Sequence, residues 1–181
     1  MSDDISNKVK IQYEENPYPR WRAGNAYMDS KCTPTALINT EINPNSIQSN
    51  LDGRKLKILI AGCGTGDQIL CAQRYSRAEI TAIDLSLSSL SYAKRKLINM
   101  DIKNVTLIQM DILNLNLLGE KFDIIECCGV LHHMDNPTLG LKILINSLHQ
   151  NGFMRLSLYS EPARKNVILA RKYIKNYKIT P

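Results

Sequence analysis

The sequence predicts an α/β fold, a three-layer, doubly wound and mainly parallel sheet with helices on both faces. From residue 55 onward, apolar runs of strand length alternate with segments of helical periodicity. The runs are apolar throughout, which is typical of strands that are covered on both faces. A glycine-rich turn follows the first run directly, and folds of this class bind ligands at the carboxyl ends of their strands.

Residues 1–50 are predicted to form an irregular, polar N-terminal arm in front of a domain at 51–181. Pro17 and Pro19 exclude a continuous helix around them. The arm holds one aromatic and basic cluster, which consists of Tyr13, Tyr18, Arg20, Trp21 and Arg22. We leave open whether this cluster folds over a ligand as a lid or packs on the sheet as a surface arm.

The domain is expected to contain five strands, at residues 55–62, 79–85, 105–111, 121–128 and 152–160. Helices are expected at 67–76, 86–100, 137–150 and 163–177. Ser86 is the expected N-cap of the second helix. Pro137 suits the start of the third helix, and Asn151 with Gly152 suits the position just past its end.

Composition excludes several classes of protein. The five cysteines have neither CxxC nor Cys/His metal spacing, so we expect free thiols, no disulfide and no metal site. No apolar run approaches the roughly 18 residues of a membrane span. The N-terminus is polar and carries acid, so no secretory signal is expected and the default location is the cytoplasm.

The net charge of +6 is unevenly distributed. From residue 161 onward, six basic residues stand against one glutamate, and the rest of the chain carries a net charge of +1. We interpret the basic closing helix as a solvated face over apolar Val167, Ile168 and Ile174. Without a basic track elsewhere, a nucleic-acid partner is not expected.

The stretch ILIAGCGTGD, at 58–67, limits the choice of ligand. A P-loop is excluded because no Lys-Ser or Lys-Thr follows the turn. A dinucleotide fingerprint needs glycine or alanine at position 67, and the chain has Asp67 there. A carboxylate at this helix start repels a pyrophosphate and suits a ligand with a positive group.

Two acids follow at the ends of predicted strands. Asp84 closes the second strand, where a carboxylate accepts hydrogen bonds from both hydroxyls of a ribose, and Asp111 closes the third. Taken singly, Asp84 could be a helix cap and Asp111 a turn residue. Together with the glycine turn, the two acids indicate a nucleoside ligand.

His132 and His133 form the plausible acid/base pair, because they lie on the loop after the fourth strand and imidazole titrates near neutrality. The alternative is that one packs under the loop and the other only shapes the pocket. The adjacent Cys127 and Cys128 lack a neighbouring base, so we expect them to pack as small side chains.

Four motifs in order, AGCGTGD, AIDLS, QMDI and FDIIECCGVLHHMDNP, resemble those of class I S-adenosylmethionine-dependent methyltransferases. The resemblance covers residues 55–160 and implies a Rossmann-like fold with S-adenosylmethionine as the cofactor. It also implies cofactor-binding roles for Gly62, Cys63, Gly64 and Gly66 under the methionine part, Asp84 at the ribose, Leu85, Asp111 and Ile112 around the adenine, and Cys128 near the methyl group.

The segments QYEENPYPRW, VLHHM and LSLYSEPAR also resemble a bacterial subgroup of this family that can carry tetratricopeptide repeats, which this sequence lacks. One departure concerns the C-terminus. The family usually ends with a helix and a hairpin of two further strands, but only 21 residues follow Ser160. We therefore expect either a truncated or divergent domain without this hairpin, or closing strands that come from elsewhere. An open edge at the fifth strand would invite association.

The resulting hypothesis is a methyltransferase that acts on a small molecule or a protein side chain. The alternative is a non-catalytic binding or scaffold module that keeps the fold. A nicotinamide-dependent dehydrogenase is disfavoured by Asp67.

Overall fold

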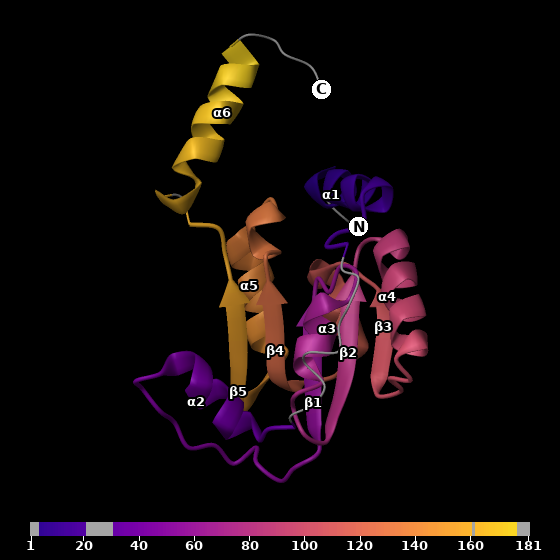
Figure 1. Cartoon of the computed structure of the whole chain (residues 1–181), viewed down its shortest axis with the longest axis vertical. Coiled ribbons are helices and arrows are strands. Elements are labelled where there is room, and N and C mark those ends of the chain that lie inside the picture. Colours follow the sequence, from indigo (N-terminus) through magenta and orange to yellow (C-terminus); the bar gives the residue numbers. More distant parts are fainter. Residues whose placement is uncertain (1–3, 21–30, 161, 177–181) are drawn as a thin grey trace.

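The computed structural model describes residues 4–20, 31–160 and 162–176. Its five strands form one parallel sheet in the order β3-β2-β1-β4-β5 (Figure 1). The strands are β1 (Leu56–Ala61), β2 (Ala78–Asp84), β3 (Val105–Gln109), β4 (Phe122–Cys128) and β5 (Leu148–Ser157). The strand order reverses between β1 and β4, which creates a crevice at their carboxyl ends. The predicted fold class is confirmed.

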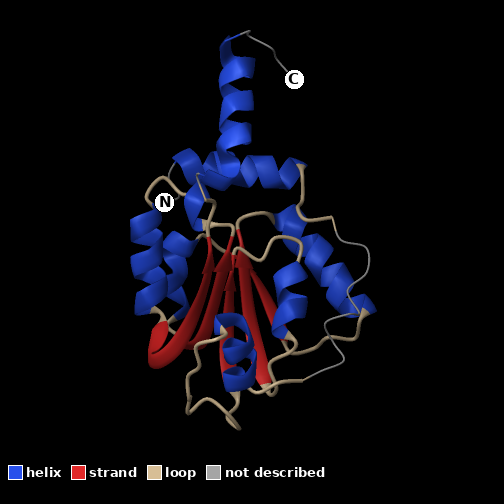
Figure 2. Cartoon of the chain, turned by 60° about the vertical axis from the view of Figure 1, so that its left-hand side comes forward, coloured by secondary structure: helices blue, strands red, loops and turns tan. Residues whose placement is uncertain are grey.

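Helices cover both faces of the sheet, so the domain has three layers (Figure 2). Side chains of Ile58 and Ile60 point to one face and those of Leu59 and Ala61 to the other, because successive residues of a strand alternate. The first face packs against α2 (Pro34–Ile42), α3 (Asp67–Ala72) and α4 (Leu87–Asn99). The second packs against η2 (Ile112–Leu118), η3 (Leu131–His133) and α5 (Pro137–Asn146).

The prediction of an irregular N-terminal arm is wrong, because the arm contains two helices, α1 (Asp4–Glu15) and α2. Helix α2 begins with a side-chain cap, in which Thr33 accepts a hydrogen bond from the backbone N–H of Ala36, and it buries Leu37 in the core. Helix α1 is polar overall but carries one short apolar row, Ile5, Val9 and Tyr13, spaced by four residues, which the sequence interpretation did not use. It ends before Pro17, as expected, and Figure 1 shows it above the carboxyl ends of β1 and β2.

The third predicted helix is wrong at its C-terminal end. Helix α5 stops at Asn146, and β5 already begins at Leu148, so His149 lies in a strand. Gly152 is a strand residue and does not terminate a helix. A Cβ atom there would lie 2.7 Å from the carbonyl oxygen of Asp123, so glycine permits a close approach of β5 to β4.

Beyond β5, the chain forms η4 (Pro162–Arg164) and α6 (Lys165–Asn176), and α6 projects away from the sheet (Figure 1). The expectation that apolar residues are covered beneath this helix is wrong, since Val167 is 41 % and Ile174 is 47 % exposed. Within the described residues no strand follows β5, so β5 is an edge strand, as expected. No helix in the described part of the chain is long and apolar enough to cross a membrane.

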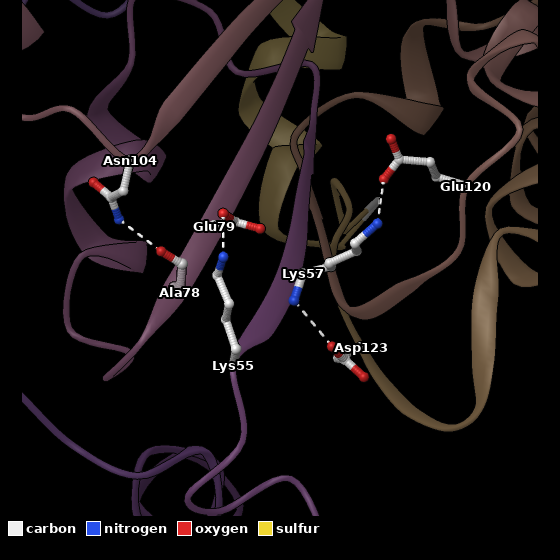
Figure 3. A network of polar contacts seen from close by, with 7 residues as sticks. All are labelled: Lys55, Lys57, Ala78, Glu79, Asn104, Glu120 and Asp123. Carbon is white, nitrogen blue, oxygen red and sulfur yellow. Dashed lines mark hydrogen bonds and ion pairs between the residues drawn. The ribbon is translucent and has the colours of Figure 1, made fainter.

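Polar contacts join the amino ends of the strands, at the end of the sheet that lies opposite the crevice (Figure 3). The backbone N–H of Lys57 donates to Asp123 Oδ2 at 2.9 Å, and Asp123 is only 3 % exposed. The side chain of Lys57 pairs with Glu120 at 2.8 Å, with both groups about half exposed. Asp123 therefore satisfies a backbone donor, whereas Glu120 makes an ordinary surface ion pair.

Asp123→Ala should lower the free energy of unfolding by about 1–3 kcal/mol, because it leaves the N–H of Lys57 without its acceptor. Glu120→Ala should cost at most about 1 kcal/mol, as is usual for an exposed ion pair. Urea denaturation of both variants at moderate salt measures the difference. Equal losses for the two variants would contradict this account.

Candidate functional site

A cavity of about 480 Å³ opens at the carboxyl ends of the strands. The loops after β1, β2, β3 and β4 contribute to its wall, and α1 contributes from above. The lining residues are Ser6, Val9, Tyr13, Tyr18, Pro19, Gly62, Cys63, Gly64, Asp67, Gln68, Asp84, Leu85, Met110, Asp111, Ile112, Cys128, Gly129, Val130, His133, Met134 and Tyr159. The cavity thus lies at the switch in strand order, where open α/β sheets bind ligands.

The glycine turn between β1 and α3 needs glycine for two reasons. Gly62, Gly64 and Gly66 all have positive φ angles, of 79°, 51° and 98°. A Cβ atom on Gly64 would also lie 2.6 Å from the backbone oxygen of Tyr18. The backbone N–H and the hydroxyl of Thr65 donate to the carbonyl oxygens of Tyr18 and Pro19. The N-terminal segment therefore lies directly on the turn.

Asp84, at the end of β2, joins the glycine turn to α4. Its Oδ2 accepts the N–H of Gly64 at 2.7 Å and its Oδ1 accepts the N–H of Ser86 at 2.9 Å. Ser86 itself caps α4, as predicted, so Asp84 is not the cap of that helix. Burial raises the pKa of Asp84, and each oxygen keeps a further lone pair for a hydroxyl donor.

Asp111 has an oxygen that is ready for a ligand. Its Oδ1 accepts the N–H of Leu113 at 2.9 Å, while its Oδ2 is buried without a hydrogen-bond partner. A buried carboxylate oxygen without a donor is costly, and a ligand donor in the cavity would satisfy it. Leu85, Met110 and Ile112 surround this part of the cavity with the apolar surface that a flat ring needs.

The start of α3 offers acceptors for a positive group. Asp67 begins the helix, and Gln68 donates through Nε2 to the carbonyl oxygen of Cys128 at 3.1 Å. This bond leaves Gln68 Oε1 buried without a partner. Burial raises the pKa of Cys127 to about 12 and also raises that of Cys128, so both thiols are protonated and unsuited to nucleophilic attack.

His132 and His133 lie together after β4, with ring centroids 4.3 Å apart, but they face different surroundings. His133 lines the cavity, and its Nε2 is buried without a partner. His132 stacks on Tyr159 at 3.6 Å between centroids and accepts the N–H of Tyr159 through Nδ1 at 3.4 Å. Burial lowers the pKa of both rings, and the positive charge of Arg164 adds to this effect.

Helix α1 is fixed over the cavity by its C-terminal end. The two oxygens of Glu14 accept the N–H groups of Leu87 and Ser88 at 2.7 and 2.8 Å. The hydroxyl of Ser86 donates to the carbonyl oxygen of Tyr13 at 3.0 Å. Hydrogen bonds from Ser88 lower the pKa of Glu14, so the contact is charged at neutral pH.

Most residues singled out from the sequence line this one cavity. The exceptions are His132, which supports Tyr159, and Gly66, which packs against α4 with its Cα side facing Ala93. The assigned roles remain predictions. Trp21 and Arg22 of the aromatic cluster lie outside the described residues. Across the described ranges, no three His, Cys, Asp or Glu side chains gather as metal ligands would.

Sequence reasoning did not select Gln68, Tyr159 or the helix-α1 residues Ser6 and Val9. Gln68 could have been found from its place in the first turn of the helix that follows the glycine turn. Tyr159 follows β5 and is brought to the cavity by the parallel arrangement of β4 and β5. Val9 could have been found from its spacing of four residues from Ile5 and Tyr13, whereas no sequence pattern indicates Ser6.

Comparison with known proteins places the chain in context. A family model described as "Methyltransferase domain" matches residues 52–177. The chain is 30 % identical over 183 residues to uncharacterized protein syc1184_c of Synechococcus, covering 92 % of this chain and 40 % of that relative. It is 31 % identical over 161 residues to uncharacterized protein RP028 of Rickettsia prowazekii, covering 87 % and 61 %. The chain thus spans about half the length of these relatives.

A solved structure, PKMT2 from Rickettsia typhi in complex with AdoHcy, is similar with a TM-score of 0.58 and 27 % sequence identity. The match covers 70 % of this chain and 25 % of that protein. AdoHcy is S-adenosylhomocysteine, which remains after S-adenosylmethionine has given up its methyl group.

Gly64→Ala should destabilise the fold by more than Gly119→Ala. Both positions have positive φ, which costs a residue with a side chain about 1–2 kcal/mol. Only at Gly64 does the new Cβ also meet backbone, whereas nothing lies within 4 Å at Gly119. Thermal unfolding of both variants measures the difference, because Gly119→Ala adds only backbone strain, whereas Gly64→Ala adds backbone strain and also displaces the Tyr18 segment. Equal shifts in melting temperature would refute the close approach.

Proposed function

Since this chain belongs to the methyltransferase domain family, we propose that it is an S-adenosylmethionine-dependent methyltransferase acting on a small molecule or a protein side chain. The observation that carries the proposal is the pair Asp84 and Asp111. Asp84 ends β2 and Asp111 follows the neighbouring β3, and both carboxylates line one cavity together with the glycine turn. Asp111 also keeps one buried oxygen without a hydrogen-bond donor. A nucleoside carries both hydroxyl donors on its ribose and an amino donor on its base, one kind for each carboxylate.

The residues present fit the cofactor from one end to the other. Asp84 would accept hydrogen bonds from the ribose hydroxyls, and Asp111 Oδ2 would accept one from the exocyclic amine of adenine. Leu85, Met110 and Ile112 would pack against the adenine ring. Asp67 and the free Oε1 of Gln68 would receive the amino group of the methionine part.

The chain's own contribution to methyl transfer is mainly orientation. When bound, S-adenosylmethionine supplies an electrophilic methyl group on a sulfonium that is a good leaving group. The glycine turn, with Gly62 and Gly64 in the wall, allows the backbone to approach the ligand closely. Cys128, Gly129 and Val130 bound the crevice after β4, so an acceptor held there would be aligned with the methyl group.

Helix α1 would act as a lid that excludes water. Ser6, Val9 and Tyr13 close the cavity from above, and Glu14 holds the helix to the start of α4. Because the cavity lies beneath α1, cofactor exchange would require the Glu14 contact to open. This extends the proposal to residues 4–15 of the predicted arm.

The proposal also covers partners and location. A substrate follows from methyl transfer itself, and we expect neither a nucleic-acid partner nor a membrane span, with action in the cytoplasm. The unpaired edge of β5 favours association with a second copy. Sedimentation of the purified chain tests this last point.

Isothermal titration calorimetry with S-adenosylmethionine and S-adenosylhomocysteine tests cofactor binding. Asp84→Ala and Asp111→Asn should each weaken binding about tenfold to a hundredfold, because each removes a hydrogen bond to a charged acceptor worth about 1.5–3 kcal/mol. Glu79→Gln, an exposed change at the opposite edge of the sheet, is the matched control. Absence of binding by the wild type at millimolar ligand, or unchanged affinity in both variants, would overturn the proposal. Binding without turnover on any acceptor would favour the scaffold alternative.

Glu14→Ala should speed the release of S-adenosylhomocysteine several-fold and lower the free energy of unfolding by about 0.5–2 kcal/mol, because Ser86 still caps α4 but the N–H groups of Leu87 and Ser88 in its first turn lose their acceptor. The neighbouring exposed Glu15→Ala is the control. Since the pKa of Glu14 is lowered, the contact persists above the ordinary glutamate pKa and is lost only as the pH falls through the lowered value. Stopped-flow fluorescence measures release, and identical rates in both variants would rule out a lid held by Glu14.

A further inference from the structure

The cavity divides into two halves along the strand order. Asp84 and Asp111 follow β2 and β3, on one side of β1. The other half lies over β4 and β5, where His133 follows β4 and Tyr159 follows β5. If the nucleoside occupies the first half, as the proposed function requires, then the second half receives the methyl acceptor. We call this second half the acceptor half. Its rings are His133 and Tyr159, and Tyr13 of α1 borders both halves, since its ring meets His133 and its backbone oxygen accepts from Ser86.

The acceptor half is aromatic. The ring of His133 meets Tyr13 edge-on with centroids 6.2 Å apart, and it meets Tyr159 edge-on at 5.8 Å. These separations lie within the range of favourable aromatic pairs. Stacking of His132 and the N–H bond to its Nδ1 hold Tyr159 in place. An aromatic acceptor could therefore pack against the faces and edges of these rings, which are held in fixed positions.

The charge of the acceptor half is positive. The guanidinium of Arg164 lies 3.7 Å from the centroid of Tyr159, and the charges of Arg164 and Arg171 both act on His133. The carboxylates among the lining residues are Asp67, Asp84 and Asp111, which stand at the start of α3 and in the nucleoside half. Asp135, close to His133 in sequence, is exposed and does not line the cavity. The positive charges of Arg164 and Arg171 stand near this half although neither side chain lines it, and no carboxylate lines it, so an anion is favoured there over an ammonium group.

His133 supplies a proton acceptor at this place. Its Nε2 is buried and has no partner in the described structure. Burial and the charges of Arg164 and Arg171 lower its pKa, so the ring is neutral at pH 7 and carries a lone pair on one nitrogen. The tautomer with its proton on Nδ1 presents that lone pair through Nε2.

From these observations we propose that the acceptor is a phenol and that His133 is its general base, an inference that rests on the proposed methyl transfer. The phenolic oxygen forms the bond to the methyl carbon as the carbon–sulfur bond breaks, and the bonding pair passes to sulfur. The phenolic proton goes to Nε2 of His133. The charge of Arg164, which lies on the Tyr159 ring and acts on His133 without lining the cavity, favours the negative charge that develops on the oxygen, and Tyr13 and Tyr159 hold the ring.

Three matched probes separate a phenol acceptor from an amine. They are 4-hydroxyphenylacetate, which has a phenol and an anionic tail, tyramine, which has the same phenol and a cationic tail, and phenylethylamine, which has the amine alone. With isotopically labelled S-adenosylmethionine and mass spectrometry, the label should appear on the phenolic oxygen, and kcat/KM should be at least tenfold higher for 4-hydroxyphenylacetate than for tyramine. Label on nitrogen would overturn the proposal. So would a lack of both binding and turnover with the two phenols on protein that binds the cofactor by calorimetry, a result that leaves the proposed function standing.

His133→Gln separates catalysis from packing. It should lower kcat about a hundredfold or more, as loss of a general base does, with KM changed less than threefold. The same change at His149, on β5 at the far end of the sheet, should leave kcat unaltered. In the wild type kcat should fall as the pH drops through the lowered pKa of His133, and this acidic limb should vanish in His133→Gln. An unchanged kcat or an unchanged acidic limb in His133→Gln would overturn the role of His133.

A spectroscopic measurement tests the same residue without turnover. In histidine-labelled protein saturated with S-adenosylhomocysteine, addition of 4-hydroxyphenylacetate should shift the imidazole resonance that is missing in His133→Gln. The resonance of His149 should stay in place. No shift at His133 while the ligand binds would place the phenol elsewhere and overturn the proposal.

Discussion

The site depends on the two hydrogen bonds that Asp84 accepts from the backbone. By holding the N–H groups of Gly64 and Ser86, one carboxylate fixes the glycine turn to the end of β2 and to the first turn of α4. Gly62, Gly64 and Gly66 occupy positive φ angles that other residues resist, so glycine allows this shape of the turn and the hydrogen bonds to Asp84 hold it. The residue proposed to bind the ribose is therefore also the residue that shapes the loop beneath the methionine part. Binding and local architecture rest on one group, and its burial raises its pKa.

The same connection extends to the lid. Ser86, held by Asp84, donates to the carbonyl oxygen of Tyr13, and the next two N–H groups of α4 are bound by Glu14. On its other side the glycine turn carries Tyr18 and Pro19 through Thr65. The N-terminal segment is thus attached at two places, the start of α4 and the glycine turn, and the hydrogen bonds of Asp84 connect these two places. A ligand that engages Asp84 would stabilise both attachments, and this couples occupancy of the cavity to its cover.

The sequence predicted the features that follow from local rules, such as helix caps and the glycine turn. It also predicted the strands, because strands that are buried on both faces are apolar throughout. Ser86 caps α4 because its side chain and the adjacent backbone suffice for that geometry, and the glycine spacing of the turn is visible in the chain itself. Helix α1 escaped prediction because its stability comes from Glu14 and Tyr13 contacts with α4, more than 70 residues away. The end of α5 was misplaced because Leu148 and Gly152 suit a helix end locally, while pairing of β5 with β4 decides their structure. Tyr159 reaches the cavity only through tertiary packing, so no periodic pattern marks it, whereas Gln68 lies in the first turn after the glycine turn and was overlooked.

The two halves of the cavity suit a reaction between opposite charges. Acids line the half where a cationic cofactor would lie, and Arg164 lies on Tyr159, whose ring lines the half where an anionic oxygen would form. Once the phenolic proton has moved to His133, transfer of a methyl group from a sulfonium to the phenolate oxygen cancels these two charges, and the positive charge that remains lies on the imidazole. The transition state between sulfonium and phenolate therefore carries less charge at the reacting atoms than that pair does. An apolar, covered cavity destabilises the separate charges of the sulfonium and the phenolate more than it destabilises the transition state, in which these charges are smaller. Closure of α1 would strengthen this effect by removing water. On this argument a modest base such as a neutral imidazole is enough, because the enclosure and the alignment of the two halves supply the remaining acceleration.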